Sequence, residues 1–337
     1  MKKIIVLLLP VAILLCSALS DDLEIKGDTP VWEVLKKLGE PMPNHTTNTS
    51  VKGYSVELGR TIIFDGVGQD AKGDKSKLQS KHFVCTSCHN MEKEDPDLAK
   101  HDPEARLNYV AEKGLPFLQG TTLYGAVNRS SFYNDDYEKK YGDLVKPARN
   151  NLREAIQLCA VECSQGRRLK TVELESVLGF LWTLELKMED LNLAESDYAQ
   201  IEKAANGNGD KMATATKVKE QYSKGSPAHF INPPSDRKRS TNLTGNPENG
   251  KKIYELGCLH CHGHERYSFF DLDDSKPSFG YLERHMGKYD ERSVYQVVRY
   301  GAPPHPGKRA YMPQYPVERM SRQQMEDLRA YIVKRAE

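Results

Sequence analysis

The chain has 337 residues, a length that accommodates two ordinary domains, and its 38% hydrophobic content favours modest cores over one large core. Its 48 basic and 47 acidic residues give a formal net charge of +1, which offers no support for nucleic-acid binding. Helical periodicity recurs and no strand-rich region stands out. The sequence therefore predicts an all-α protein without a nucleic-acid partner.

The first feature in chain order is a predicted signal peptide over residues 1–20. Two lysines precede the apolar run from Ile4 to Leu15, and small residues at Ala18 and Ser20 offer a cleavage site. A run of about a dozen residues is short for a membrane span. We therefore expect a periplasmic or otherwise exported protein, with an uncleaved N-terminal membrane anchor as the alternative. Cleavage would remove Cys16 and leave six cysteines.

The next segments read as an N-terminal extension and a first domain. Residues 21–55 are rich in Pro, Asn and Thr and hold one amphipathic stretch, so we assign them to an extension. Helical spacing of apolar residues resumes near Val56, and a proline-free helical pattern covers residues 173–182. The first domain is predicted to span residues 56–190 and to close with that helix.

A linker and a second domain complete the chain. Residues 191–240 combine glycines, prolines and a basic run, which is typical of a connector with some helix inside. The second domain is predicted over residues 241–337. Its closing helix begins at Ser321, which has the N-cap position of a capping box with Gln324. Each half thus has a short helix, a cysteine motif, a long loop and a closing helix, which suggests a weak duplication.

The strongest signal is a pair of Cys-x-x-Cys-His motifs, Cys85-Thr86-Ser87-Cys88-His89 and Cys258-Leu259-His260-Cys261-His262. Two cysteines at this spacing form thioethers to haem vinyl groups, and the next histidine becomes the proximal iron ligand. Zinc is the alternative for four Cys and two His, but each copy is a complete haem motif. We therefore predict two covalently bound haem c groups, in two cytochrome c-like helical domains.

The sixth iron ligand of the second haem is predicted to be Met312, 50 residues beyond His262 and shortly before the closing helix. Met286 and His305 are the competing ligands, and a core methionine is the alternative for Met312. The layout from Gly250 to Ile332 resembles that of class I cytochromes c. That resemblance implies His/Met ligation, and the soft neutral thioether favours ferrous iron and a high reduction potential.

The first haem lacks an equivalent Met-Pro, and its ligand region holds Cys159 and Cys163 instead. Met91 lies too close in sequence to His89 to reach the opposite face of the haem, and Met188 lies beyond the expected ligand loop. A thiolate opposite histidine would lower the reduction potential strongly. We predict Cys159 as the iron ligand, with Cys163 and His101 as the alternatives. A Cys159–Cys163 disulfide and free buried thiols are the non-ligand interpretations.

Residues 56–190 and 245–337 resemble the thiosulfate dehydrogenase family and, more distantly, the haem-bearing A subunit of the sulfur-oxidation complex. The matching features are Leu58-Gly59-Arg60, Cys85-Thr86-Ser87-Cys88-His89, the segment from Thr122 to Arg129, and Cys159 followed by Gly166 and Leu169. The resemblance implies a cysteine ligand on an active-site haem. The chain departs from the family in having Glu162-Cys163-Ser164-Gln165-Gly166 where an Arg-Ser-Met-Asn-Gly stretch is usual.

Three functions are compatible with these features. The first is a dedicated electron carrier between redox partner proteins, such as other cytochromes or membrane oxidoreductases. The second is a thiosulfate dehydrogenase-like enzyme, with Cys159 at the catalytic haem and a small sulfur oxyanion as substrate; Arg129, Arg167 and Arg168 are its candidate anion contacts. The third is a peroxidase, which would require a weak distal histidine such as His101.

Overall fold

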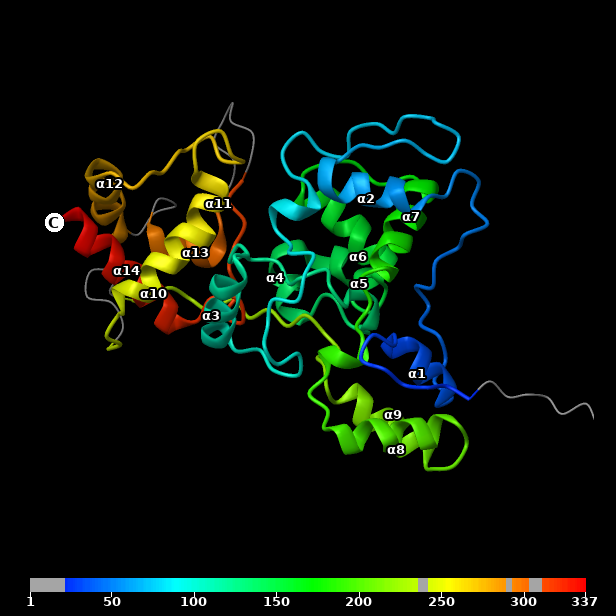
Figure 1. Ribbon diagram of the computed structural model, residues 1–337. Helices are drawn as coiled ribbons and strands as arrows, with labels where there is room; N and C mark the ends of the chain where they lie inside the picture. Colours follow the sequence, from blue (N-terminus) through cyan, green and yellow to red (C-terminus); the bar gives the residue numbers. More distant parts are fainter. Residues whose placement is uncertain (1–21, 236–241, 289–292, 303–310) are drawn as a thin grey trace, which may run out of the picture.

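The computed structural model describes residues 22–235, 242–288, 293–302 and 311–337. Within these ranges the chain is helical, with isolated β-bridges and no strand, so the prediction of an all-α fold with two helical lobes is confirmed (Figure 1). None of the described helices is long and apolar enough to cross a membrane. The predicted signal peptide lies outside the described residues. The helices are α1 (Val31–Lys37), α2 (Val56–Asp65), α3 (Pro103–Lys113), α4 (Glu138–Tyr141), α5 (Val145–Ala148), α6 (Leu152–Leu158), α7 (Thr171–Trp182), α8 (Glu195–Ala205), α9 (Lys211–Lys219), α10 (Pro247–Ile253), α11 (Leu259–His262), α12 (Lys276–Met286), α13 (Val294–Tyr300) and α14 (Arg322–Ala336).

The first lobe is built on the crossing of α2 and α7. Ser55 caps α2 by accepting a hydrogen bond from the Leu58 amide, and the apolar face of α2 buries Leu58 and Ile63. At the crossing point a Cβ atom on Gly59 would lie 1.9 Å from the Ser176 carbonyl oxygen. Only glycine allows the two backbones to approach this closely.

The second lobe repeats this arrangement with α10 and α14. A Cβ atom on Gly250 would lie 2.0 Å from the Asp327 carbonyl oxygen. Ser321 caps α14 and forms the predicted capping box with Gln324. The helix before each cysteine motif therefore crosses the closing helix of its own half at a glycine.

The predicted N-terminal extension and linker pack together as a small third cluster. The apolar stripe of α1, with Val34 and Leu35, contacts the stripe of α8 and α9, where Ile201 and Val218 are fully buried. The Asn206 side chain holds the segment before α1 in place by accepting a hydrogen bond of 2.8 Å from the Leu23 amide. Figure 1 shows these three helices together, beside the first lobe.

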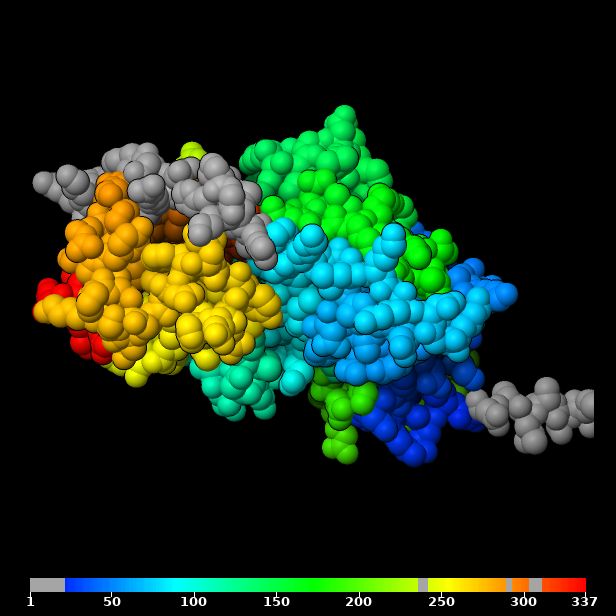
Figure 2. All heavy atoms as spheres, turned by 90° about the horizontal axis from the view of Figure 1, so that it is seen from above, coloured from blue at the N-terminus to red at the C-terminus, as the bar shows by residue number. Residues whose placement is uncertain are grey.

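Helix α3 belongs to the first half of the sequence but packs in the core of the second lobe. Leu107 and Val110 of α3 are buried against Ile253 of α10, and the following Phe117 donates its amide to the Leu256 carbonyl oxygen. Figure 2 shows the two lobes side by side. The domain limits at residues 190 and 241 stay a prediction, while residues 103–118 join the two lobes.

Candidate functional site

The first candidate site is a cavity of about 210 Å³ in the first lobe. Cys85 begins a 3₁₀ turn, Cys85–Ser87, and this turn sets Cys85, Cys88 and His89 on the cavity wall. Most of the remaining wall is apolar, and α2, α6 and α7 contribute part of it. The two cysteines predicted as candidate ligands, Cys159 and Cys163, line the same cavity.

The orientation and tautomer of His89 are set at its ring nitrogen Nδ1. That atom lies 2.6 Å from the Thr121 carbonyl oxygen, so Nδ1 carries the proton and Nε2 keeps its lone pair. Burial lowers the pKa of His89, which keeps the imidazole neutral. A neutral ring with a fixed tautomer is the form that binds a haem iron.

Cys159 and Cys163 lie on a π-helical turn, Cys159–Cys163, that continues α6. The hydroxyl oxygens of Tyr133 and Tyr141 lie 3.8 and 3.5 Å from the Cys163 sulfur. Hydrogen bonding with Cys159 and with these hydroxyls lowers the pKa of Cys163 to about 7, against the effect of burial. The pKa of Cys159 is raised by its hydrogen bond with Cys163 and by burial. Both cysteines are free thiols, so the disulfide interpretation is not supported.

The second candidate site is a cavity of about 440 Å³ in the second lobe. Cys258 ends a π-helical turn, Tyr254–Cys258, and the next helix, α11, holds Cys261 and His262. His262 Nδ1 lies 2.8 Å from the Phe270 carbonyl oxygen, which again leaves Nε2 free. Met312 lines the same cavity and is held by a bridge of backbone hydrogen bonds with Ala302.

The competing ligand candidates lie elsewhere or outside the described residues. His101 does not line the first cavity; its Nε2 lies 2.9 Å from the Ser223 hydroxyl, beside a separate small cavity. Met188 is fully buried in the cluster of α1, α8 and α9, and Met286 is buried in the core of the second lobe. His305 lies outside the described residues. Among the described candidates, Cys159, Cys163 and Met312 are the ones on cavity walls.

The two cavities meet at one set of side chains. Phe83, Gln119, Tyr311 and Pro313 line both cavities. The rings of Phe83 and Tyr311 are edge to face with centroids 5.8 Å apart. Because the shared wall is one side chain thick, the two cysteine motifs lie back to back across the contact of the lobes.

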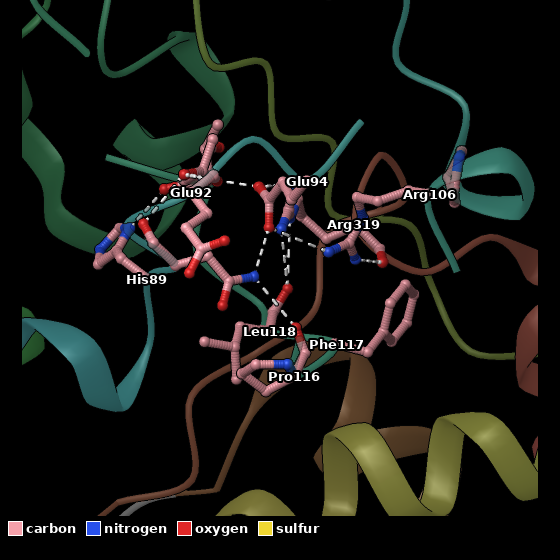
Figure 3. Close-up of polar contacts among 12 residues, drawn as sticks. His89, Glu92, Glu94, Arg106, Pro116, Phe117, Leu118 and Arg319 are labelled. Atoms are coloured by element: carbon pink, nitrogen blue, oxygen red, sulfur yellow. Dashed lines mark hydrogen bonds and ion pairs between the residues drawn. The ribbon is translucent and has the colours of Figure 1, made fainter. Parts of the chain in front are cut away.

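A buried ion network lies next to the first motif (Figure 3). Glu94 is fully buried, with Arg319 Nη1 at 2.8 Å and Arg106 Nη1 at 3.5 Å. Burial alone raises the pKa of the Glu94 carboxyl, but Arg319 and Arg106, with hydrogen bonds from Arg319 and Asn90, lower it to about 2. Glu94 also accepts the Thr122 amide at 2.7 Å, next to the carbonyl that orients His89. The network therefore ties the haem-motif loop to α3 and to the second lobe.

Of the three arginines predicted as anion contacts, only Arg129 lines the first cavity. Its guanidinium contacts the Ser226 hydroxyl at 3.5 Å and the Tyr124 carbonyl at 3.2 Å, and burial lowers its pKa to about 10. Arg167 is paired with the buried Glu173, and Arg168 is exposed beside Glu154. Neither of these two arginines is on the cavity wall.

Sequence reasoning missed the side chains between the cavities. Tyr311 could have been found, since it precedes Met312 directly. No local sequence pattern marks Gln119, Glu94 or Arg319 as part of a site. Their places in it depend on contacts between short loops or between residues 200 or more positions apart. Nothing in the sequence indicates that Tyr133 and Tyr141 contact a cysteine.

The two cavities fit haem c in donor chemistry and in lining. Each has two cysteines and a histidine with a fixed tautomer on its wall, and most of the remaining wall is apolar. In the described part of the chain no three His, Cys, Asp or Glu side chains are grouped to hold a lone metal ion. Cys85, Cys88 and His89 would hold one haem, and Cys258, Cys261 and His262 the other.

Residues 245–332 match the family model described as cytochrome C oxidase, cbb3-type, subunit III. The matched segment, about a quarter of the chain, contains α10 to α13, most of α14 and the whole second motif. This part of the chain is therefore a class I c-type cytochrome domain, which implies covalently bound haem and electron transfer through it. No curated protein and no solved structure matches the chain.

Proposed function

We propose that the chain is an exported dihaem cytochrome that passes single electrons between partner proteins through two haems in contact across the lobe interface. The observation that supports this most strongly is the shared wall of Phe83, Gln119, Tyr311 and Pro313 between the two cavities. Haem supplies a one-electron couple at each site. With a wall one side chain thick, electrons need not pass through solvent between the sites.

The residues facing each cavity support unequal reduction potentials. In the second site the ligands are His262 and Met312, and the neutral thioether favours ferrous iron. In the first site the ligands are His89 and the thiolate of Cys159, which favours ferric iron. The first haem therefore acts as the low-potential site and the second as the high-potential site, so electrons leave through the second lobe.

The number of haems is the direct test. We expect mass spectrometry of the purified holoprotein, expressed with haem-attachment machinery, to give the apoprotein mass plus two haems. The double variants C85A/C88A and C258A/C261A should each lose one haem and keep the other. Retention of two haems by C85A/C88A, or a wild type with a single haem, would contradict the proposal.

Oxidation of a small sulfur oxyanion is the second candidate function, and Arg129 on the wall of the first cavity favours it. In the balanced reaction two thiosulfate ions join through a new S–S bond and release two electrons, one to each haem. The test is mixing of ferric holoprotein with thiosulfate in a stopped-flow spectrometer. Reduction of haem that is lost in R129Q would favour the enzyme, while no reduction would favour the electron carrier.

A further inference from the structure

Arg129 presents a guanidinium to the first cavity without a carboxylate partner in the described part of the chain. It donates two hydrogen bonds, to the Ser226 hydroxyl at 3.5 Å and to the Tyr124 carbonyl oxygen at 3.2 Å. A guanidinium has five N–H donors, so donors remain for a further acceptor. Because a charge withdrawn from water is costly unless it is paired, this position favours an anion in the cavity.

The other guanidinium on the same wall is already engaged. Arg319 forms an ion pair with Glu94 at 2.8 Å and donates to the Leu118 carbonyl oxygen at 3.1 Å. None of the described residues that line the first cavity is an aspartate or a glutamate. Arg129 is therefore the guanidinium on this wall whose charge the wall itself does not balance.

Two carboxylates act on Arg129 from outside the cavity, and neither forms an ion pair with it among the described residues. Glu94 raises the pKa of Arg129 but is bound to Arg319 and Arg106. Asp95 lies with Arg129 on the wall of a neighbouring cavity of about 40 Å³, and burial raises the pKa of Asp95 to about 6. The other charged or titratable side chains around that small cavity are Lys100, His101, Tyr124, Tyr222, Glu318 and Arg319. Asp95 is thus the competing carboxyl that a test must separate.

The second cavity differs in this respect. The described residues on its wall include no lysine, arginine, aspartate or glutamate. A free guanidinium is therefore a property of the first cavity within the described part of the chain. The second site consequently serves as an internal reference for any effect of Arg129.

We propose that Arg129 binds a propionate carboxylate of the first haem. The inference rests on the proposed function, in which a haem is attached at Cys85 and Cys88. Haem brings two carboxylates into an otherwise apolar cavity, and the planar guanidinium fork matches the two oxygens of a carboxylate. Its positive charge disfavours ferric iron, so Arg129 raises the reduction potential of the first haem. Arg129 is a positioning residue and no iron ligand, and its free donors are taken by the haem instead of a substrate anion.

The first test is a spectroelectrochemical titration of the dihaem holoprotein, with the second haem as reference. In R129Q above neutral pH, we expect the ferrous-to-ferric ratio of the first haem at fixed potential to fall roughly tenfold, or about 59 mV for one electron. The difference from wild type should shrink as the pH falls, because a carboxylate without its guanidinium takes up a proton when the haem is reduced. R129K keeps the charge and should keep most of the wild-type potential.

Arg168→Gln is the matched control, because it removes the same charge from an exposed arginine of the first lobe that is not on the cavity wall. It should leave the potential of the first haem and its pH dependence unchanged. An unchanged potential in R129Q, or an equal shift in R168Q, would overturn the proposal.

Redox-difference infrared spectroscopy identifies the carboxyl. We expect R129Q to show a protonated-carboxyl band on reduction, and this band should shift when the haem is made from δ-aminolevulinic acid with a heavy carbon isotope in its carboxyl group. That carbon becomes the propionate carboxyl carbon. If the band does not shift with the label and disappears in R129Q/D95N, the partner of Arg129 is Asp95 and the proposal is wrong.

The outcomes separate this inference from the proposed function. Absence of haem at Cys85 and Cys88 in the wild type, measured by mass, would mean that the proposed function itself fails. A wild-type potential in R129Q together with lost reduction by thiosulfate would assign Arg129 to a substrate anion and overturn the propionate contact. If R129Q does not retain the first haem, R129K decides. Its labelled carboxylate band should differ from that of the wild type, because an ammonium group lacks the guanidinium fork, and identical bands would overturn the proposal.

Discussion

Met312 places a thioether on the wall of the second cavity, whereas Cys159 and Cys163 place two thiols on the wall of the first. The two motif histidines make the same kind of hydrogen bond. His89 donates its Nδ1–H to the Thr121 carbonyl oxygen, and His262 donates its Nδ1–H to the Phe270 carbonyl oxygen. With haem at both sites, as proposed, the sulfur ligands on the opposite walls would give the two haems different potentials, because a neutral thioether favours ferrous iron and an anionic thiolate favours ferric iron.

The variant Met312→Ala should lower the reduction potential of the second haem, because it removes the soft ligand that favours ferrous iron. We expect a fall of at least tenfold in the ferrous-to-ferric ratio at fixed potential, or about 59 mV, in a spectroelectrochemical titration of the holoprotein. Met286→Leu is the control, since Met286 is buried in the core outside the cavity. A potential that changes in M286L and not in M312A would identify Met286 as the ligand instead.

At the scale of the elements, each lobe depends on one glycine at the crossing of its first and last helices. Added Cβ atoms on Gly59 and Gly250 would overlap backbone carbonyl oxygens of α7 and α14. A clash with backbone cannot be relieved by a side-chain rotation, so the helices would have to separate. The helices support the two cysteine motifs, and their separation would loosen the cavity walls.

Gly59→Ala should therefore destabilise the holoprotein by about 2 to 3 kcal/mol, as measured by urea unfolding followed by circular dichroism. Gly280→Ala in α12 is the matched control. Its added Cβ meets only the flexible end of the Arg284 side chain at 3.9 Å, so the gain in helix propensity should stabilise by up to about 1 kcal/mol. Equal effects in the two variants would mean that the crossing of α2 and α7 does not require glycine.

The third helical cluster shows why an element can be predicted without its partner. Helix α1 was recognisable as an amphipathic stretch, and the presence of helix inside residues 191–240 was expected. Their mutual packing joins segments about 170 residues apart, with Val34 and Leu35 against Ile201. Apolar periodicity identifies the buried face of a helix but not what covers it.

At the scale of the whole molecule, Glu94 joins the loop of the first motif to the second lobe. The carboxylate receives Arg319 from the second lobe and Arg106 from α3, and the Arg106 guanidinium lies 3.9 Å from the ring centre of Phe117. Arg319 also donates to the Leu118 carbonyl oxygen at 3.1 Å. These contacts hold the lobes at a fixed distance, which keeps the shared cavity wall thin.

Glu94→Gln should destabilise the holoprotein by about 3 kcal/mol, because it leaves two buried guanidiniums without their carboxylate. Urea unfolding at neutral pH measures the loss. Glu57→Gln is the control, since the Glu57–Arg60 pair at 2.8 Å is exposed and should contribute less than about 1 kcal/mol. A loss in E94Q no larger than in E57Q would contradict a structural role for the network.

The pH dependence gives a second measurement on the same variant. The pKa of Glu94 falls from the ordinary 4.5 to about 2 on folding, so its stabilisation is complete above pH 4.5 and is lost as the pH falls through 2. The difference in unfolding free energy between wild type and E94Q should therefore shrink between about pH 4.5 and 2. A difference that stays constant over this range would show that the Glu94 pKa is not lowered by folding.

The sequence by itself determined the helical class, the two cysteine motifs and the capped closing helix. It could do so because helical periodicity, the Cys-x-x-Cys-His spacing and the Ser321 capping box are local patterns of a few residues. The nomination of Cys159, Cys163 and Met312 as candidate ligands also came from local composition. Their choice as ligands stays a prediction, although all three lie on the cavity walls.

Only the tertiary structure decided how these local units combine. It placed α3 in the second core, brought Glu94 to Arg319 across more than 200 residues, and set two tyrosine hydroxyls on the Cys163 sulfur. Such contacts depend on the approach of distant backbones and on the burial of charge, and neither quantity is encoded in a short stretch of sequence. For the same reason, the thin wall between the two cavities could not be inferred from the two motifs alone.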